Sequence, residues 1–99
     1  MDIQYQLQGI LFEWDLKKAD ENILNHGIEF EVACEAFFDP FVCTLEEEVH
    51  RNEVRETLIG MTLSWKVLYV VFTIQRGDAF RLISARVATA KERRIYEDH

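Results

Sequence analysis

Arginine residues stand at the ends of two apolar segments, and a histidine stands at the end of a predicted helix. Arg86 closes the segment FRLISAR and is followed by Thr89-Ala90-Lys91-Glu92, which matches the S/T-x-x-E signature of a helix start. Arginine binds phosphate oxygens through paired hydrogen bonds, and free N–H groups at a helix start attract anions. The unit therefore predicts a site for an anionic group. Arg55 stands at the start of another apolar segment, and His26 is a candidate proton carrier. The candidate catalytic set is therefore His26, Arg55 and Arg86.

Two of these candidates also have a purely structural explanation. His26 precedes Gly27, and a histidine in the last helical turn can bond the final carbonyls and favour the helix dipole. Arg55 lies between Glu53 and Glu56, where it can be a solvated charge at a sheet edge. For His26 and for Arg55, the sequence permits both a catalytic and a structural role.

The two arginines of the segment Phe80–Val87 are predicted to point in opposite directions. Arg81 and Arg86 are five residues apart, and side chains alternate between the faces of a strand. Both can reach one phosphate only if one of them bends round a strand end, so we expect one to pair with a helix carboxylate. For Arg86 the alternative is an ion pair with Glu92 or with an acid of the first helix. For Arg81 the alternative is a paired structural role, because the rest of its face is apolar.

The final helix and the two tryptophans supply weaker candidates. Lys91 and Arg93 fit a solvated basic face, which attracts polyanions without specificity. Tyr96 lies four residues after Glu92 and can face the same site, although a buried ring with its hydroxyl at the rim is the simpler explanation. Trp14 and Trp65 can stack on nucleic-acid bases, but tryptophan beside a strand is more often part of a core.

Composition predicts one small domain over residues 1–99 in a reducing compartment. The 99 residues are 48% apolar with a net charge of −7. The charge is uneven, since residues 1–48 hold 2 Lys/Arg against 12 Asp/Glu and residues 49–99 hold 9 against 6. Cys34 and Cys43 match neither a redox pair nor a zinc pattern, so free thiols are expected. No export or membrane signal is visible, which favours the cytoplasm.

Capping signals and apolar spacing predict three helices. The first spans Leu16–His26, with Asp15 as its N-cap and Gly27 as its left-handed C-terminal cap. The second spans about Phe30–Phe38 and stops before Asp39-Pro40. The third begins after Thr89 and reaches Tyr96.

Segments rich in Val, Ile, Thr and aromatic residues predict the strands. A short strand at about Ile10–Trp14 follows a polar and loose start. Four consecutive antiparallel strands are expected at Val42–Glu47, Glu56–Trp65, Lys66–Gln75 and Ala79–Val87. In the third of these, Leu68, Val70, Phe72 and Ile74 form one apolar face that should lie against the helices. The predicted fold is therefore α+β: two N-terminal helices, a four-stranded antiparallel meander plus the short N-terminal strand, and a C-terminal helix, with the helices on one face.

Several of these segments together resemble the BrnT toxins of bacterial toxin-antitoxin pairs. The matching pieces are FEWDLKKADENILNHGIEFEVACEAFFDP (Phe12–Pro40), RETLIGM (Arg55–Met61), LYVVFTIQRGDAFRLISAR (Leu68–Arg86) and ATAKERRIYE (Ala88–Glu97). They include the Asn-x-x-x-His-Gly helix end, the Phe-x-Asp-Pro stop and the Arg-Leu-Ile-Ser-Ala-Arg strand. The chain departs from the family at Asn25, where lysine is usual, and at Glu29, where serine or threonine is usual.

The resemblance implies a compact relative of the RelE-type ribonucleases that inhibits growth by cutting RNA. The implied chemistry is metal-free, with the RNA 2′-hydroxyl attacking the adjacent phosphorus and no cofactor. Under this interpretation His26, Arg55 and Arg86 are the catalytic candidates, and Arg81, Lys91, Arg93 and Tyr96 bind RNA. The implied partner is a BrnA-like ribbon-helix-helix antitoxin, which silences the toxin and alone contacts operator DNA.

Two other function classes remain. The first is a binding module whose nuclease activity has decayed and which serves only as an antitoxin-holding co-repressor. The acidic N-terminal half and Asn25 are compatible with this role. The second is a metal-dependent hydrolase that uses His26, His50 and nearby carboxylates, although no recognisable ligand spacing supports it.

Overall fold

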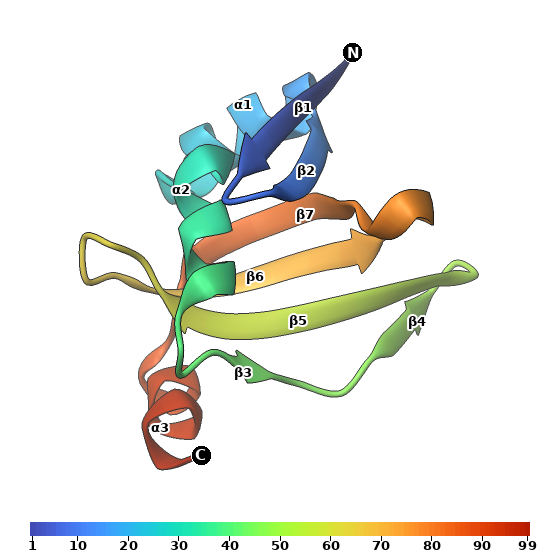
Figure 1. Ribbon diagram of the computed structural model, residues 1–99. Helices are drawn as coiled ribbons and strands as arrows, with labels where there is room; N and C mark the ends of the chain where they lie inside the picture. The colour runs from blue at the N-terminus through green and yellow to red at the C-terminus, as the bar shows by residue number, and fades with distance from the viewer.

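A computed structural model of residues 1–99 shows three α-helices and a mixed sheet of seven strands (Figure 1). None of the helices is long and apolar enough to cross a membrane. In chain order the elements are β1 (Asp2–Leu7), β2 (Ile10–Asp15), α1 (Leu16–His26), α2 (Phe30–Glu35), the 3-10 turn η1 (Ala36–Phe38), β3 (Cys43–Thr44), β4 (Glu48–His50), β5 (Glu53–Met61), β6 (Val67–Ile74), the 3-10 turn η2 (Arg76–Asp78), β7 (Phe80–Val87) and α3 (Ala90–Asp98).

The strand order is β1-β2-β7-β6-β5-β3, and β4 pairs with β5. The meander β5-β6-β7 is antiparallel as predicted, and β3 joins β5 through only two residues. The predicted purely antiparallel sheet is wrong, because β2 pairs in parallel with β7 through Phe12–Phe80 and Glu13–Arg81. The predicted loose start is also wrong. Residues 2–7 form β1 and pair with β2, since every second side chain is apolar and packs on the core.

The helix boundaries follow their caps. The Asp15 carboxylate accepts a hydrogen bond from Lys18 N at 3.2 Å, and Gly27 has a φ of 70° and donates its N–H to Ile23 O at 2.8 Å, so α1 has its predicted bounds. The second helix is shorter than predicted, because α2 ends at Glu35 and the chain continues as η1 before Asp39. The capping box at Thr89 and Glu92 is present at the start of α3.

The main core lies between α2 and one face of the sheet. It contains three of the four predicted β6 side chains, Leu68, Val70 and Phe72, together with Phe12 and Trp14 of β2, whereas the fourth, Ile74, is exposed. The backbone of η1 lies directly on β5, because a Cβ at Gly60 would stand 2.5 Å from Ala36 O. Cys34 and Cys43 are both buried free thiols, and burial raises the pKa of Cys34.

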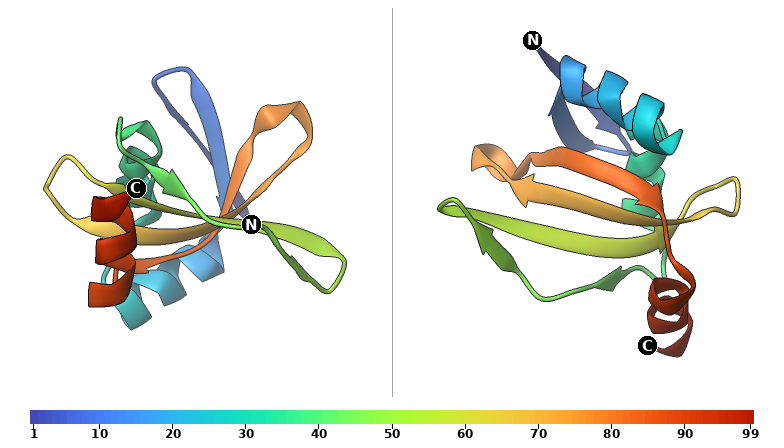
Figure 2. Two further views of the ribbon diagram at one scale, coloured as in Figure 1. Left: turned by 90° about the horizontal axis from the view of Figure 1, so that it is seen from below. Right: turned by 180° about the vertical axis from the view of Figure 1, so that it is seen from behind.

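The other sheet face is only partly covered. α3 packs at one end of it, over a smaller cluster that contains Ile59, Val67, Tyr69 and Tyr96. The helices therefore do not all lie on one face as predicted. The right view of Figure 2 shows that no helix crosses the centre of this face, while α1 lies along the β7 edge.

Candidate functional site

A β-bulge in β7 brings Arg81 and Arg86 onto the same face of the sheet. Arg81 pairs with Thr73 of β6, but after an irregularity in the register Arg86 pairs with Tyr69. Thr73 and Tyr69 are four residues apart on β6, so they share a face. Ile83 is the unpaired extra residue that shifts the alternation of β7. The prediction that the two arginines point in opposite directions is therefore wrong.

Arg55 belongs to the same face. It lies two residues before Thr57 on β5, and Thr57 pairs with Val71 of β6. We call this surface the open face and define it by Arg55, Thr57, Tyr69, Val71, Thr73, Arg81, Ser84 and Arg86. Arg55 and Arg81 lie toward its Thr73 end and Arg86 toward its Tyr69 end, about 13 Å apart along β6. The arginines are thus spread along a surface and do not meet at one point.

Arg86 is held between α3 and an aromatic ring. Its Nη1 and Nη2 donate to the two carboxylate oxygens of Glu92 at 2.8 and 2.9 Å, and its guanidinium lies 4.2 Å from the centre of the Tyr69 ring. The hydrogen bonds with Glu92 raise the pKa of Arg86, and they lower that of Glu92. The alternative ion pair with Glu92 is therefore confirmed. These contacts fix the guanidinium in place, while about a third of the side chain stays exposed.

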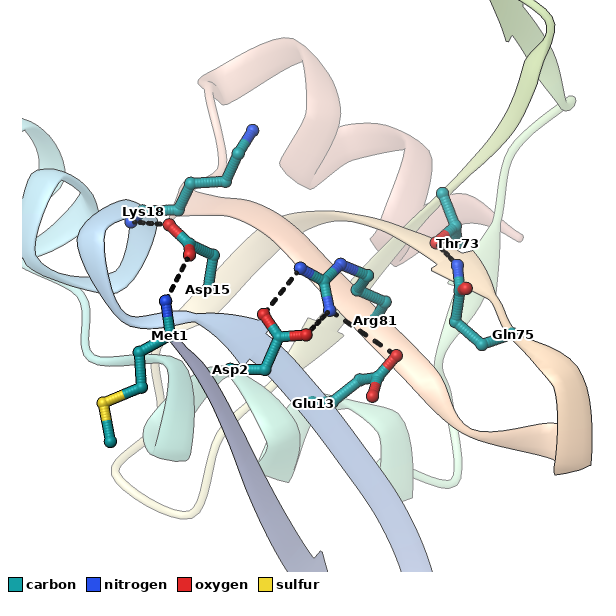
Figure 3. A network of polar contacts seen from close by, with 8 residues as sticks. All are labelled: Met1, Asp2, Glu13, Asp15, Lys18, Thr73, Gln75 and Arg81. Carbon is teal, nitrogen blue, oxygen red and sulfur yellow. Dashed lines mark hydrogen bonds and ion pairs between the residues drawn. The ribbon is translucent and has the colours of Figure 1, made fainter.

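Arg81 and Arg55 are also paired with acids. Arg81 donates to both carboxylate oxygens of Asp2 at 3.1 and 3.3 Å and lies 3.6 Å from Glu13, so it connects β7 to β1 and β2 (Figure 3). Its hydrogen bonds lower the pKa of Asp2. Arg55 Nε donates to Glu53 at 3.2 Å, within the predicted acidic neighbourhood. Every arginine of the open face thus has at least one carboxylate partner.

His26 lies at the β7 edge of the open face. It is exposed at the end of α1 and lines a hollow of about 160 Å³ with Lys18, Glu21, Asn22, Asn25, Ile83 and Ser84. Ser84 also belongs to the open face, between Arg81 and Arg86, so the hollow adjoins the arginines. None of the three arginines lines either of the two cavities of the molecule. The structure therefore places the catalytic candidates on adjoining surfaces and not in one pocket.

The remaining candidates lie on α3. Lys91 and Arg93 are exposed and form no ion pair within 4 Å. Tyr96 does not face Arg86, because its hydroxyl donates to Asp39 Oδ2 at 2.5 Å. Burial and this hydrogen bond raise the pKa of Tyr96 to about 12. Tyr96 thus attaches α3 to the segment after η1.

Two carboxylates hold α3 on the sheet, so we expect α3 to loosen at acidic pH before the central strands do. Burial alone would raise the pKa of Asp39, but hydrogen bonds from Tyr96 and from the Phe41 and Met61 N–H groups outweigh it, so the pKa of Asp39 is lowered. The pKa of Glu92 is lowered as well. Carboxylates with lowered pKa values stabilise the folded state above about pH 4 and lose this contribution as the pH falls through the lowered values.

Hydrogen exchange measured between pH 6 and 3 tests this expectation. The α3 amides should lose protection below about pH 4, while the β6 amides serve as an internal reference. The variant Glu92→Gln should show a weaker pH dependence in α3. Equal loss in α3 and β6 at every pH would show that the two carboxylates do not hold α3 specifically.

Sequence reasoning missed several residues that shape this site. Ser84 and Tyr69 stand among apolar residues and emerge only from the strand register. Asn22 was visible as a polar residue within the apolar stripe of α1. It is 5% exposed, and its amide bonds the backbone of Ile28 and Ala85.

Comparison with known proteins gives two findings. A family model described as the ribonuclease toxin BrnT of type II toxin-antitoxin systems matches residues 14–92. The fold is similar to the crystal structure of the Brucella abortus ribonuclease toxin BrnT, with 25% identity and a TM-score of 0.52, over 77% of this chain and 92% of that one. No functionally curated protein matches the chain.

Proposed function

Because the chain belongs to the BrnT family of ribonuclease toxins of type II toxin-antitoxin systems, we propose that it is an endoribonuclease toxin that needs no metal ion and inhibits growth by cutting RNA. The observation that carries this proposal is the presence of Arg55, Arg81 and Arg86 on one open face beside the hollow that contains His26. The sequence features that resemble this family include a strand with two arginines followed by a capped helix. In the fold these are β7 and α3.

The reaction requires three groups. The RNA 2′-hydroxyl gives up its proton to a base, its oxygen attacks the adjacent phosphorus, and the 5′-oxygen of the next nucleotide leaves with a proton from an acid. Negative charge builds on the phosphate in between, where fixed cations stabilise it. Arg86 suits this role because Glu92 and Tyr69 hold its guanidinium in a fixed orientation. His26 suits proton transfer because an imidazole can both accept and donate a proton.

The open face also suits the approach of RNA to an acidic protein. Arg55, Arg81, Arg86, Lys91 and Arg93 all lie within residues 49–99, the half with a net positive charge. In our proposal Arg86 contacts the scissile phosphate, and Arg55, which lies toward the other end of the open face, contacts another phosphate of the same RNA strand. Arg81, the unpaired cations Lys91 and Arg93, and the neighbouring Tyr96 contact flanking parts of the strand. Attraction by unpaired surface cations is independent of sequence and weakens with salt.

The toxin family implies an antitoxin partner. We propose that this partner is a BrnA-like ribbon-helix-helix protein, that the pair contacts operator DNA only through the antitoxin, and that both act in the cytoplasm. No cofactor is required by the proposed chemistry, because the nucleophile belongs to the RNA.

One observation favours the second candidate function, a co-repressor with decayed activity. Arg55, Arg81 and Arg86 are each paired with a carboxylate, which reduces the positive charge presented to RNA. A protein that only holds the antitoxin would need no free cation on this face. The nuclease proposal requires these pairs to leave outward N–H groups available, as the partial exposure of Arg86 permits.

Incubation of the purified toxin with single-stranded RNA decides between these functions. We expect cleavage at an unchanged rate in excess chelator, with cyclic phosphate at the new 3′ ends, because the nucleophile is the 2′-hydroxyl. Loss of cleavage in chelator would indicate a metal-dependent hydrolase. A toxin that binds the antitoxin but leaves RNA intact under all conditions would indicate the co-repressor.

A further inference from the structure

The largest cavity lies away from the open face, at the end of the sheet on the α2 side. Its volume is about 380 Å³, and it is enclosed by the β1–β2 turn, the end of η1 and the β5–β6 turn. In Figure 1 the β5–β6 turn extends to the left of α2, while the β1–β2 turn lies on the other side of this helix. Among its lining residues, Tyr5, Leu7 and Phe38 pack against the main core, which places the cavity on the face opposite the arginines.

Two exposed apolar side chains stand at the mouth of this cavity. Leu63 and Trp65 line it from the β5–β6 turn, and they are 83% and 79% exposed. The sequence favours a core position for both tryptophans. Trp14 is in the core, but Trp65 is not. A large apolar residue so exposed beside an apolar hollow is a typical anchor of a protein–protein interface.

The turn that presents Trp65 is fixed, although its backbone is unfavourable. Trp65 has a φ of 68°, a left-handed conformation that bulky residues rarely adopt. Hydrogen bonds hold the turn in this form: Trp65 N donates to Thr62 O at 3.1 Å, Leu63 N to Glu35 Oε1 at 3.0 Å, and Lys66 N to Thr62 Oγ1 at 3.2 Å. Because the backbone of this turn is already held in place, little backbone entropy is lost when a partner binds. Backbone strain of this kind points to function more than to stability.

The acidic residues around the cavity indicate which kind of partner can bind there. Its charged lining residues are Glu35 and Asp39, and no Lys, Arg or His lines it. The first 48 residues, which supply both acids, hold 2 Lys/Arg against 12 Asp/Glu. An acidic rim repels the phosphates of RNA and attracts a protein segment that carries Lys or Arg beside an apolar side chain.

We propose that this cavity is the docking surface for the antitoxin. In this arrangement an apolar side chain of the antitoxin fills the cavity between Phe38 and Trp65, and a neighbouring Lys or Arg faces Glu35. The inference rests on the proposed function only for the identity of the partner, which the toxin family implies. It also separates two surfaces, since the antitoxin is anchored on the α2 side while RNA is cut on the open face.

Affinity for the antitoxin encoded beside the toxin, measured by calorimetry with purified full-length proteins, tests the proposal. We expect Trp65→Ala to weaken binding about thirtyfold or more and Leu63→Ala about tenfold, because anchors at an interface centre dominate affinity. Glu35→Gln should weaken it a few-fold and reduce its salt dependence, while the amide oxygen still accepts from Leu63 N. Leu24→Ala is the matched control, since Leu24 is 85% exposed on α1 and does not line the cavity.

RNA cleavage and oligomeric state complete the test. The free Trp65→Ala and Leu63→Ala variants should cut RNA at the wild-type rate, if the wild type does so, and elute at its size. Affinities equal to that of Leu24→Ala would overturn the docking proposal whether or not the protein is a nuclease. A change in self-association would assign the cavity to a second copy of the chain, and slower RNA cleavage with unchanged antitoxin affinity would assign it to RNA.

Discussion

The variant Arg86→Ala is expected to cleave RNA at least about a hundredfold more slowly than the wild type. Removal of one fixed donor from a developing oxyanion typically reduces the rate by this amount or by up to about a thousandfold. Arg86 is the best candidate for such a donor, because its bonds to Glu92 and its contact with Tyr69 orient it before substrate binds. The measurement is single-turnover cleavage of a labelled RNA by the antitoxin-free protein.

Loss of Arg86 also leaves Glu92 unpaired, so a structural explanation has to be separated from a catalytic one. Glu92→Gln weakens the same contact to α3 but keeps the guanidinium, one acceptor oxygen for it and its contact with Tyr69, so it should retain cleavage within a few-fold. Arg86→Lys keeps the charge but loses the paired donors, and it should fall between Arg86→Ala and the wild type.

Arg76→Ala, which removes an exposed arginine of η2 outside the open face, is the control for net charge. Equal losses in Glu92→Gln and Arg86→Ala would show that Arg86 acts only by holding α3.

Local signals in the sequence predicted the local structure well. The bounds of α1 follow from Asp15 and Gly27, and the start of α3 follows from Thr89 and Glu92, because caps act on backbone groups within four residues. The ion pair of Arg86 with Glu92 was also foreseeable, since the two residues are six positions apart and the capping box fixes Glu92.

Features that depend on distant segments were not predictable in the same way. The parallel contact of β2 with β7 joins residues almost seventy positions apart, and the salt bridge of Arg81 to Asp2 follows from it. The alternation of apolar residues in β1 is present in the sequence, but an edge strand is half polar, so the segment resembles a loose start.

The bulge at Ile83 decides which residues form the open face, and neither glycine nor proline marks it. A single extra residue reverses the faces of all side chains on one side of it. Here it aligns Arg81 with Arg86 and brings Ser84 between them. The arginines of the site were therefore visible in the sequence, while their arrangement and the presence of Ser84 and Tyr69 beside them depend on the strand register.

Asn22 shows how the fold maintains this register where strand pairing stops. β2 pairs with β7 only as far as Arg81, so the outer edge of β7 near Ala85 has no neighbouring strand. The Asn22 amide takes the place of a neighbouring strand. Its Nδ2 donates to Ala85 O at 2.9 Å and to Ile28 O at 2.8 Å, and its Oδ1 accepts from Ala85 N at 3.0 Å. A single side chain thus satisfies three backbone groups and fixes α1, with His26, beside β7.

Asn22→Ala should therefore lower the free energy of unfolding by about 3 kcal/mol, since each buried backbone group that loses its partner costs about 1–3 kcal/mol and water from the adjoining hollow offsets part of this. Asn22→Asp should also be strongly destabilising, because a carboxylate keeps the bond to Ala85 N but has no donor for the two carbonyls. Asn25→Ala, in the same helix but exposed, should change stability by no more than about 0.5 kcal/mol. Urea unfolding measures all three, and equal stabilities of Asn22→Ala and Asn25→Ala would show that the edge of β7 does not depend on this amide.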